Sequence, residues 1–351
     1  MPDFEKISLS EEQMHQTVFV SGDAHPELAV DIVERLGIEH IPVKTSQHPN
    51  SEEYVNILRS VRGKDVVVMQ THAETDERKS GEALIQHLLL MSAAKEASAK
   101  QITAFSPNVY GARQDKKTFG QREPITIKLT LQMLALAGAD RSLFVDIHSE
   151  QSLVAFPGVA ENIRALELVL KGVRGELTPE ELRNLDVVAP DEGRGKTARR
   201  AAKILGARAI ILDKERSSSD SQDVSHTGVA LPDLTGRTAV IIDDMIDTAG
   251  TIISAKDAIS AAGSSNIYAA ATHPWLSDPA VERLSSSGLK GIILTDTNPQ
   301  AKEAKPYFDA DPDAPKFTVV SSAGFLSDAL RQVIGNGHLE AIYENKESLE
   351  N

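Results

Sequence analysis

The sequence predicts an α/β protein made of two similar domains, each a mostly parallel sheet flanked by helices. Three observations support this fold class. A chain of 351 residues is long for one core, and domains of roughly 150 residues are usual. Short valine and isoleucine runs alternate with amphipathic segments, as buried parallel strands alternate with crossover helices. Segments 18–38 and 187–207 align without a gap, and each reads as strand, acidic turn, helix and Leu-Gly end.

The expected elements follow one another in the order that parallel sheets need. The expected strands span Thr17–Val20, Asp65–Gln70, Gln101–Phe105, Ser142–Ile147, Asp186–Ala189, Ala209–Leu212, Thr238–Ile242, Asn266–Ala271, Gly291–Thr295 and Phe317–Val320. The expected helices span Glu27–Leu36, Glu82–Ala97, Ile125–Ala137, Lys196–Leu205, Thr251–Ala262 and Phe325–Ile334. The charged segment 161–182 reads as a helical linker, so we expect an N-terminal domain of residues 1–165 and a C-terminal domain of residues 166–340.

The composition narrows the class of protein. Hydrophobic residues make up 41% and charged residues 25%, which is typical of a globular chain. The absence of cysteine excludes disulfides, thiolate metal sites and cysteine nucleophiles. A formal net charge of −14 argues against general nucleic-acid binding, although a local basic pocket remains compatible with it. The acidic N-terminus lacks the apolar core of a signal peptide, and no apolar run is long enough for a membrane span, so we expect a cytoplasmic protein.

The most informative stretch is "AVIIDDMIDTAGTII", residues 239–253. We expect its strand to end at Ile242 and a helix to begin near Gly250. Free N–H groups at a helix N-terminus, together with threonine hydroxyls, form an anion site. Carboxylates accept hydrogen bonds from vicinal hydroxyls or hold a divalent cation. The stretch therefore predicts a ribose-phosphate site, with Asp243 and Asp244 at the ring hydroxyls and residues 247–251 around the 5′-phosphate. The alternative is an acidic loop that only caps the helix.

A second candidate lies in "YGARQDKKTFGQRE", residues 110–123. Arg113, Lys116, Lys117 and Arg122 form a local positive cluster in an acidic protein. An anionic ligand such as a triphosphate would explain this cluster. By itself, however, such a run is more typical of a solvated basic loop.

Two further pairs of residues have chemical potential. Asp146 and His148 follow an expected strand, and residues two apart on an extended segment point the same way, so the pair could share one divalent ion. A structural histidine is an equally good interpretation. Lys214 and Arg216 precede the polar run 217–223, and two cations beside a closing loop suit phosphate transfer. The alternative is two exposed surface cations.

Residues 240–251 resemble the phosphoribosyl-diphosphate signature of the phosphoribosyltransferase superfamily. Within it, the chain is most similar to the ribose-phosphate pyrophosphokinase family, from about residue 18 to about residue 334. Other matching stretches are "FVSGDAHPELA", "ARQDKK", "REPITIKL", "AGADRSLFVDIHSEQ", "VVAPDEG" and "ILDKERS". The "RQDKK" and "DKER" stretches are specific to the synthetases, and ordinary phosphoribosyltransferases lack them.

The resemblance implies a fold and a reaction. Each domain would be phosphoribosyltransferase-like, with the ATP loop and metal residues in the first domain and the ribose-5-phosphate and catalytic loops in the second. The enzyme would transfer pyrophosphate from ATP to the anomeric hydroxyl of D-ribose 5-phosphate, giving 5-phosphoribosyl 1-pyrophosphate and AMP. Mg²⁺ would be the cofactor and ATP a co-substrate. The resemblance also implies a homo-oligomer, either a dimer or a hexamer. The net charge and the lack of an apolar span predict no nucleic-acid or membrane partner.

The resemblance also assigns roles to residues. Catalysis would fall to Lys214 and Arg216. Ribose 5-phosphate would contact Arg216, Asp243, Asp244, Asp247, Thr248, Ala249, Gly250 and Thr251. ATP would contact Asn50, Ser51, Glu52, Arg113, Gln114, Asp115, Lys116 and Lys117. The metal ligands would be His148 and Asp191, with support from Asp146.

The chain also departs from the family pattern. Pro157 and Glu161 stand where the family has aspartates, which weakens any expectation of a second cation site, and Arg194 stands between two glycines of the pyrophosphate turn. Two other functions remain open. A phosphoribosyltransferase that consumes phosphoribosyl pyrophosphate should lack the "RQDKK" and "DKER" stretches. Pro157 favours a non-catalytic regulatory subunit of a synthetase complex, whereas the intact catalytic-loop and metal residues argue against it.

Overall fold

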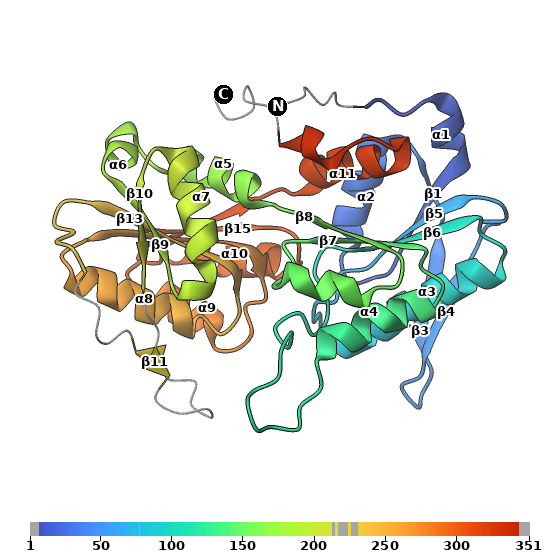
Figure 1. Ribbon diagram of the computed structural model, residues 1–351, viewed down its shortest axis with the longest axis horizontal. Helices are drawn as coiled ribbons and strands as arrows, with labels where there is room; N and C mark the ends of the chain where they lie inside the picture. Colours follow the sequence, from blue (N-terminus) through green and yellow to red (C-terminus); the bar gives the residue numbers. More distant parts are fainter. Residues whose placement is uncertain (1–6, 77, 213–214, 217–223, 226–230, 344–351) are drawn as a thin grey trace. The chain divides into compact units, whose positions relative to one another are not determined.

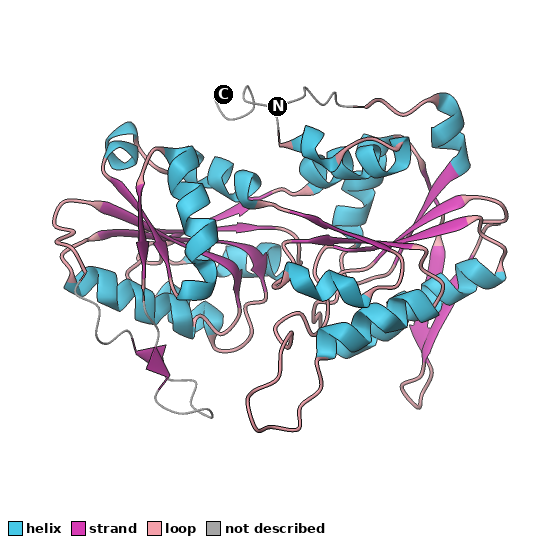
Figure 2. Ribbon diagram, in the orientation of Figure 1, coloured by secondary structure: helices cyan, strands magenta, loops and turns pink. Residues whose placement is uncertain are grey.

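The computed structural model describes residues 7–76, 78–212, 215–216, 224–225 and 231–343. The chain divides into two compact units (Figure 1): Met1–Arg164 with Ser322–Asn351, and Ala165–Ser321. Each unit contains one six-stranded sheet with helices packed beside it (Figure 2). Within the described residues, none of the helices combines the length and the apolar character that crossing a membrane requires.

The first unit is built on a sheet of order β2-β1-β5-β6-β7-β8, in which every neighbouring pair is parallel. Its strands are β1 (Thr17–Ser21), β2 (Glu39–His40), β5 (Asp65–Met69), β6 (Gln101–Ser106), β7 (Arg141–Val145) and β8 (Val159–Ile163). A separate antiparallel hairpin joins β3 (Val43–Gln47) to β4 (Glu53–Ile57). The helices are α1 (Glu11–Gln16), α2 (Pro26–Leu36), α3 (Ser80–Glu96), α4 (Thr126–Leu136) and α11 (Ala323–Gly335), with 3-10 turns at Glu150–Ala155 and Leu339–Ile342.

The second unit repeats this plan with a parallel sheet of order β10-β9-β13-β14-β15-β16. Its strands are β9 (Leu185–Ala189), β10 (Arg208–Ile211), β13 (Thr238–Ile246), β14 (Asn266–Pro274), β15 (Gly291–Thr295) and β16 (Lys316–Val320). The short strands β11 (Glu215–Arg216) and β12 (Val224–Ser225) pair antiparallel. The helices are α5 (Leu166–Glu176), α6 (Pro179–Arg183), α7 (Gly195–Leu205), α8 (Gly250–Ala261), α9 (Ala280–Ser285) and α10 (Gln300–Ala310), with a 3-10 turn at Glu192–Arg194.

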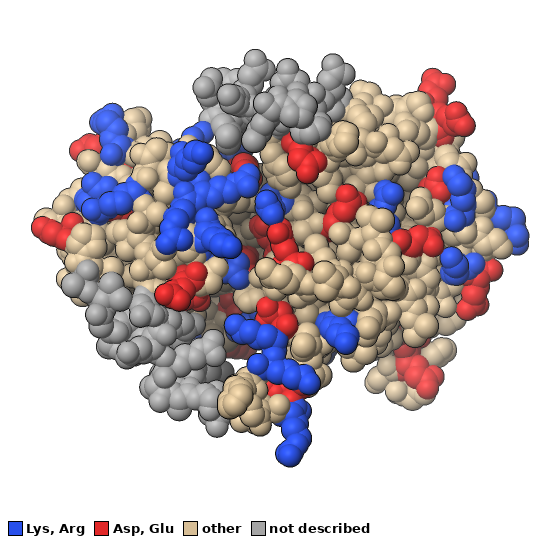
Figure 3. Space-filling model, in the orientation of Figure 1, with Lys and Arg blue, Asp and Glu red and all other residues tan. Residues whose placement is uncertain are grey.

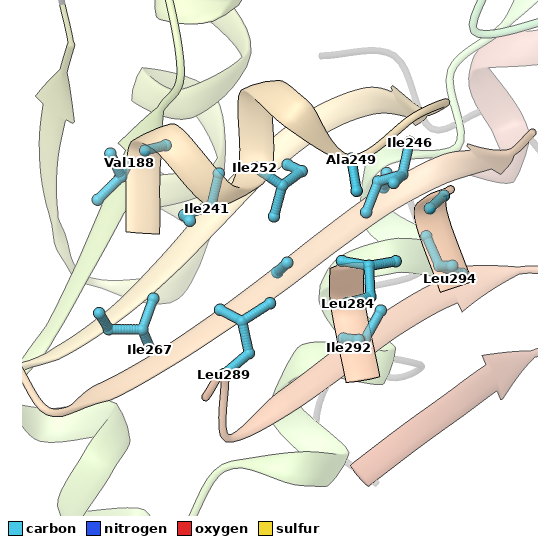
Figure 4. Packing of buried hydrophobic residues seen from close by; sticks show 14 of the residues in the cluster. Val188, Ile241, Ile246, Ala249, Ile252, Ile267, Leu284, Leu289, Ile292 and Leu294 are labelled. Atoms are coloured by element: carbon cyan, nitrogen blue, oxygen red, sulfur yellow. The ribbon is translucent and has the colours of Figure 1, made fainter. Parts of the chain in front are cut away.

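Alternating side chains of the second sheet supply two apolar layers. Ile241 of β13 packs with Ile252 of α8 and with Ile267 of β14 in the layer shown in Figure 4. Val240 of the same strand belongs to the opposite layer, with residues of α5 and α7. Because consecutive strand residues face opposite sides, a sheet covered on both faces requires a continuous apolar run, which the sequence of β13 provides.

The structure confirms the α/β fold class and corrects several details. Residues 161–163, which we expected to be helical, form part of β8, because Val159–Ile163 completes the first sheet beside β7. The boundary at residue 340 also differs, because the chain from Ser322 onward belongs to the first unit. There Leu326 and Leu330 of α11 are fully buried, and the Ser327 hydroxyl lies 3.4 Å from the carbonyl oxygen of Ile32 in α2.

A buried carboxylate links α6 to the second sheet. The Glu181 carboxylate accepts hydrogen bonds from Lys290 Nζ at 2.5 Å and from the Tyr268 hydroxyl at 3.0 Å. Its second oxygen accepts from the Thr178 N–H and hydroxyl, both at 2.9 Å. Burial by itself would raise the pKa of the Glu181 carboxyl, but hydrogen bonds from Lys290 and Thr178 outweigh burial and lower the pKa to about 2.

We expect Glu181→Gln to lower the unfolding free energy by about 2 kcal/mol at pH 7. A carboxyl with a lowered folded-state pKa stabilises the protein above its unfolded pKa, near 4.5, and this contribution is lost as pH falls toward 2. The difference between variant and parent should therefore shrink below pH 4.5, as measured by urea unfolding from pH 7 to pH 3. The exposed neighbour Glu180 provides the control Glu180→Gln, and an equal loss for both variants would contradict the assignment.

Candidate functional site

The strongest candidate is the connection between β13 and α8. We expected the strand to end at Ile242, which is wrong: β13 continues to Ile246, so Asp243 and Asp244 lie within the strand. A tight turn of Asp247, Thr248 and Ala249 follows. Ala249 is left-handed, with φ 62°, and α8 begins at Gly250 and runs for 12 residues. The turn therefore precedes the free N–H groups of a helix N-terminus, an anion-binding arrangement.

The turn is held by the core beneath it. Ile246, Ala249 and Ile252 belong to one buried cluster, and all three are labelled in Figure 4. A left-handed backbone conformation costs an L-residue about 1 to 2 kcal/mol, so packing must hold Ala249 in place. The geometry of the turn is thus fixed before any ligand binds.

The two strand carboxylates meet an arginine. The guanidinium of Arg194 lies 3.3 Å from Asp244 Oδ2 and 3.6 Å from Asp243 Oδ1. Arg194 belongs to the 3-10 turn after β9, the strand that pairs with β13. Burial and the charge of Asp244 raise the pKa of the Asp243 carboxyl well above its usual range. From sequence, Arg194 was only a departure from a family pattern, but in the structure it is the counter-ion of the carboxylate pair.

We expect Arg194→Ala to lower the unfolding free energy by about 2 kcal/mol at pH 8. A carboxyl whose pKa is raised by folding does not lower the free energy of unfolding at a pH below its unfolded-state pKa. As the pH rises through the folded-state pKa, the carboxyl ionises in an unfavourable site and the free energy of unfolding falls. Without its counter-ion the Asp243–Asp244 pair should show this loss more strongly, so the deficit should shrink when urea unfolding is repeated at pH 5. Arg194→Lys retains the charge and should lose less, and a deficit that does not depend on pH would contradict the role.

Asp191 lies beside this group. It follows β9 and caps the 3-10 turn, with its Oδ1 accepting a hydrogen bond from the Arg194 N–H at 3.2 Å. The carboxyl ends of β9 and β13 therefore carry Asp191, Asp243 and Asp244 together. Of the two expected catalytic residues, Lys214 lies outside the described residues. Arg216 belongs to β11, where it is paired with Val224 of β12.

In the first unit, the expected ATP loop follows β6. Its stem turns at Gly111, with φ 76°, and the Gln114 N–H donates to the Gly111 carbonyl at 3.0 Å. The Thr126 hydroxyl at the start of α4 bonds the Gln114 side chain. Arg113, Lys116 and Lys117 are exposed and Asp115 is half-buried. Figure 3 shows lysine and arginine side chains gathered on this loop between β6 and α4, which projects at the bottom of the view.

The expected ATP contacts Asn50, Ser51 and Glu52 form the tip of the β3–β4 hairpin, and these two strands were not among the expected elements. Ser51 is left-handed, with φ 66°, and the Glu52 N–H donates to the Asn50 side chain at 3.3 Å. Behind this tip, the buried Arg78 binds both oxygens of Asp23, at 2.9 and 2.7 Å, and also contacts Glu53 of β4. The alternating residues of the two strands around a His-Pro-Asn-Ser turn were a usable hairpin signal.

The expected metal residues of the first unit, Asp146 and His148, are not arranged as we expected. Strand β7 ends at Val145 and Asp146 has φ 37°, so Asp146 and His148 do not lie on one extended segment. The Asp146 N–H still pairs with the Ile163 carbonyl of β8 at 2.8 Å, and the positive φ of Asp146 then turns the chain out of the strand. In the part of the chain that the structure describes, no three histidine, aspartate or glutamate side chains form a group that could hold a metal ion.

Comparisons with known proteins cover both units. A family model for the N-terminal domain of ribose phosphate pyrophosphokinase matches residues 17–138, and one for the phosphoribosyl synthetase-associated domain matches residues 183–342. A ribose-phosphate pyrophosphokinase of Streptomyces coelicolor is 36% identical over 94% of this chain and 96% of its own. One of Corynebacterium efficiens is 37% identical over 92% and 94%. The crystal structure of phosphoribosylpyrophosphate synthetase from Mycobacterium smegmatis matches with a TM-score of 0.79 and 36% identity, over 92% of this chain and 100% of that chain.

Proposed function

Because the chain belongs to the ribose-phosphate pyrophosphokinase family, we propose that it transfers the pyrophosphoryl group of ATP to ribose 5-phosphate, releasing AMP and 5-phosphoribosyl 1-pyrophosphate. The observation that carries the proposal is the end of β13, where two carboxylates precede an anion-binding turn. A phosphorylated sugar offers matching groups, since its hydroxyls donate to carboxylates and its phosphate accepts from backbone N–H groups.

The reaction needs no covalent enzyme intermediate. The anomeric oxygen attacks the β-phosphorus of ATP, the bond from that phosphorus to the α–β bridging oxygen breaks, and AMP leaves with that oxygen. The proton of the anomeric hydroxyl passes to solvent. Catalysis then rests on placing the two reactants in line and on neutralising charge on the transferring phosphates.

The acceptor sugar is assigned to the second unit. Asp243 and Asp244 accept hydrogen bonds from the ring hydroxyls, and residues 247–251 surround the 5′-phosphate. Arg194 offsets part of the charge of the carboxylate pair, while burial and the charge of Asp244 still raise the pKa of the Asp243 carboxyl. The sugar hydroxyls therefore meet two closely spaced carboxyl groups that share one cation.

The donor nucleotide is assigned to the first unit. Asn50, Ser51 and Glu52 contact ATP from the tip of the hairpin. The loop residues Arg113 to Lys117 contact the phosphates, where exposed cations in an otherwise acidic protein offer charge-assisted hydrogen bonds. Lys214 and Arg216 neutralise the group in transfer, and Arg216 also contacts the sugar phosphate.

We assign Mg²⁺ as the cofactor. His148 and Asp191 would hold it, with support from Asp146. Mg²⁺ beside a nucleotide is usually held by one or two carboxylates plus the substrate phosphates, so a close group of three protein side chains is not required. When bound, the ion would offset the charge of the transferring phosphates.

The same proposal extends to the roles of the two domains, to the oligomer and to the cellular compartment. We place the ATP loop in the N-terminal phosphoribosyltransferase-like domain and the sugar and catalytic loops in the C-terminal one. We also propose a homo-oligomer, a dimer or a hexamer, that works in the cytoplasm, where both small substrates are made.

Position-labelled ATP tests the reaction. ATP labelled at its β-phosphorus should pass the label to the sugar product and leave AMP unlabelled. Formation of ADP in place of AMP would overturn the proposal, because it would mean that only the γ-phosphoryl group moves.

A further inference from the structure

Two buried histidines in the first unit have no part in the site described above. His72 lies in the connection after β5 and His87 lies in α3. Both side chains are fully buried, and His72 Nε2 lies 3.1 Å from His87 Nδ1. Burying two imidazoles is unfavourable unless each ring nitrogen has a partner, so the contacts of this pair are informative.

The outer partners fix the protons on both rings. The Tyr110 N–H donates to His72 Nδ1 at 3.0 Å, and His87 Nε2 lies 3.0 Å from the Val68 carbonyl of β5. An amide N–H can only donate and a carbonyl can only accept. His72 must therefore carry its proton on Nε2 and donate it to His87 Nδ1, and His87 must carry its proton on Nε2. Each ring is neutral and has one permitted tautomer.

The surroundings keep the pair neutral. Burial lowers the pKa of His87 to about 4, and burial together with the nearby His87 lowers the pKa of His72 well below its usual range. The titratable group that lowers the pKa of His72 is the imidazole of His87. The outer partners of the pair are uncharged backbone groups, the Tyr110 amide at His72 and the Val68 carbonyl at His87. A second proton on either ring would place two N–H groups face to face.

The chain of bonds ends at the stem of the loop that carries Arg113 and Gln114. The His72 N–H donates to the Asn108 carbonyl at 2.9 Å, so both backbone and side chain of His72 hold this stem. Gly111 comes next, and a Cβ there would lie 2.5 Å from Thr126 Cγ2, so the stem passes close to α4. A shift of Tyr110 would therefore be passed on to Arg113 three residues later.

We propose that His72 is a positioning residue that holds the ATP-binding loop beside β5 through its bond to Tyr110, and that His87 completes a relay by fixing the tautomer in which His72 accepts that bond. The inference rests on the proposed function in taking Arg113 and Gln114 as nucleotide contacts. The histidines touch no substrate themselves. Their effect should fall on the KM for ATP, and not on kcat or on the KM for ribose 5-phosphate.

Two substitutions of His72 separate positioning from plain core packing. Asparagine places an oxygen near the position of Nδ1 and keeps the acceptor for Tyr110, whereas glutamine places an NH₂ near Nε2 and keeps only the donor toward His87. Each variant loses one buried hydrogen bond, so comparable drops in thermal midpoint are expected. We expect His72→Gln to raise the KM for ATP about tenfold, and His72→Asn to leave it within about threefold. Equal values of KM for both variants would overturn the proposal.

Arg113→Ala separates this proposal from the assignment of the ATP loop. If Arg113→Ala raises the KM for ATP and His72→Gln does not, only the positioning role fails. If neither does, the loop is not the nucleotide site and both fail. A measurement that needs no variant is ¹⁵N NMR of the histidine rings in the whole protein. It should show both rings neutral with the proton on Nε2 at pH 6.5, and a proton on Nδ1 of either ring would overturn the relay.

Discussion

Lys214→Ala is expected to lower kcat by at least about 10³-fold while leaving the Kd for ribose 5-phosphate within about threefold. In our proposal the sugar binds through the end of β13 and the turn before α8, which do not include Lys214. A cation that acts on the transferring phosphates strengthens its interaction as charge develops there, so its loss falls on the chemical step and not on binding. Steady-state kinetics together with calorimetric titration of ribose 5-phosphate measures the two effects separately.

The controls follow from the same reasoning. Lys214→Arg keeps the charge and should recover part of kcat. Lys203 is an exposed lysine on α7 of the same unit, so Lys203→Ala should leave both quantities unchanged. Parallel loss of turnover and of ribose 5-phosphate binding in Lys214→Ala would mean that Lys214 binds the sugar, and its assignment to the chemical step would be wrong.

Asp186→Asn is expected to destabilise the protein by about 3 kcal/mol, the largest loss of stability that we predict. Asp186 of β9 is fully buried and binds two arginines, Arg208 Nε at 2.8 Å and Arg237 Nε at 2.5 Å. Burial by itself would raise the pKa of the Asp186 carboxyl, but hydrogen bonds from Arg237 and Arg208 outweigh it and lower the pKa. Because both arginines are partly exposed, water can solvate them in the variant, which keeps the loss below the value for a fully buried pair.

Urea unfolding at pH 7 measures this loss, with Asp257→Asn as the matched control. Asp257 forms an exposed ion pair with Lys256, and its removal should cost less than about 0.5 kcal/mol. Asp186 lies at the amino ends of two paired strands, β9 and β13. The same strands carry Asp191 and Asp243 at their other ends. The variant should therefore also bind ribose 5-phosphate less tightly. Equal losses for the two variants would show that the buried cluster has no special role.

The connection between β13 and α8 shows how far the sequence can predict a site. The apolar run and the Thr-Ala-Gly-Thr segment were sufficient to predict a strand, a turn and a helix. The strand end was not predictable, because Met245 and Ile246 stay in the strand by pairing with His273 and Pro274 of β14. That pairing depends on a strand more than twenty residues away, which local polarity does not reveal.

Contacts between distant side chains were the least predictable part. The pairing of Arg194 with Asp243, the hold of Arg78 on Asp23, and the bond from His72 to His87 each join separate elements. Strand order brings the elements together, but the rotamers that complete the contacts depend on local packing. Arginines within polar stretches therefore read as surface charges until the fold supplies their partners.

Phosphorus NMR of the purified protein with ATP, Mg²⁺ and ribose 5-phosphate observes the proposed reaction itself. We expect AMP and 5-phosphoribosyl 1-pyrophosphate to appear in equal amounts as both substrates disappear. If ribose 5-phosphate binds but no turnover occurs across pH, phosphate and metal conditions, the claim of catalysis is contradicted and the chain would be a regulatory subunit. Consumption of 5-phosphoribosyl 1-pyrophosphate only when a nucleobase is added would instead identify a phosphoribosyltransferase.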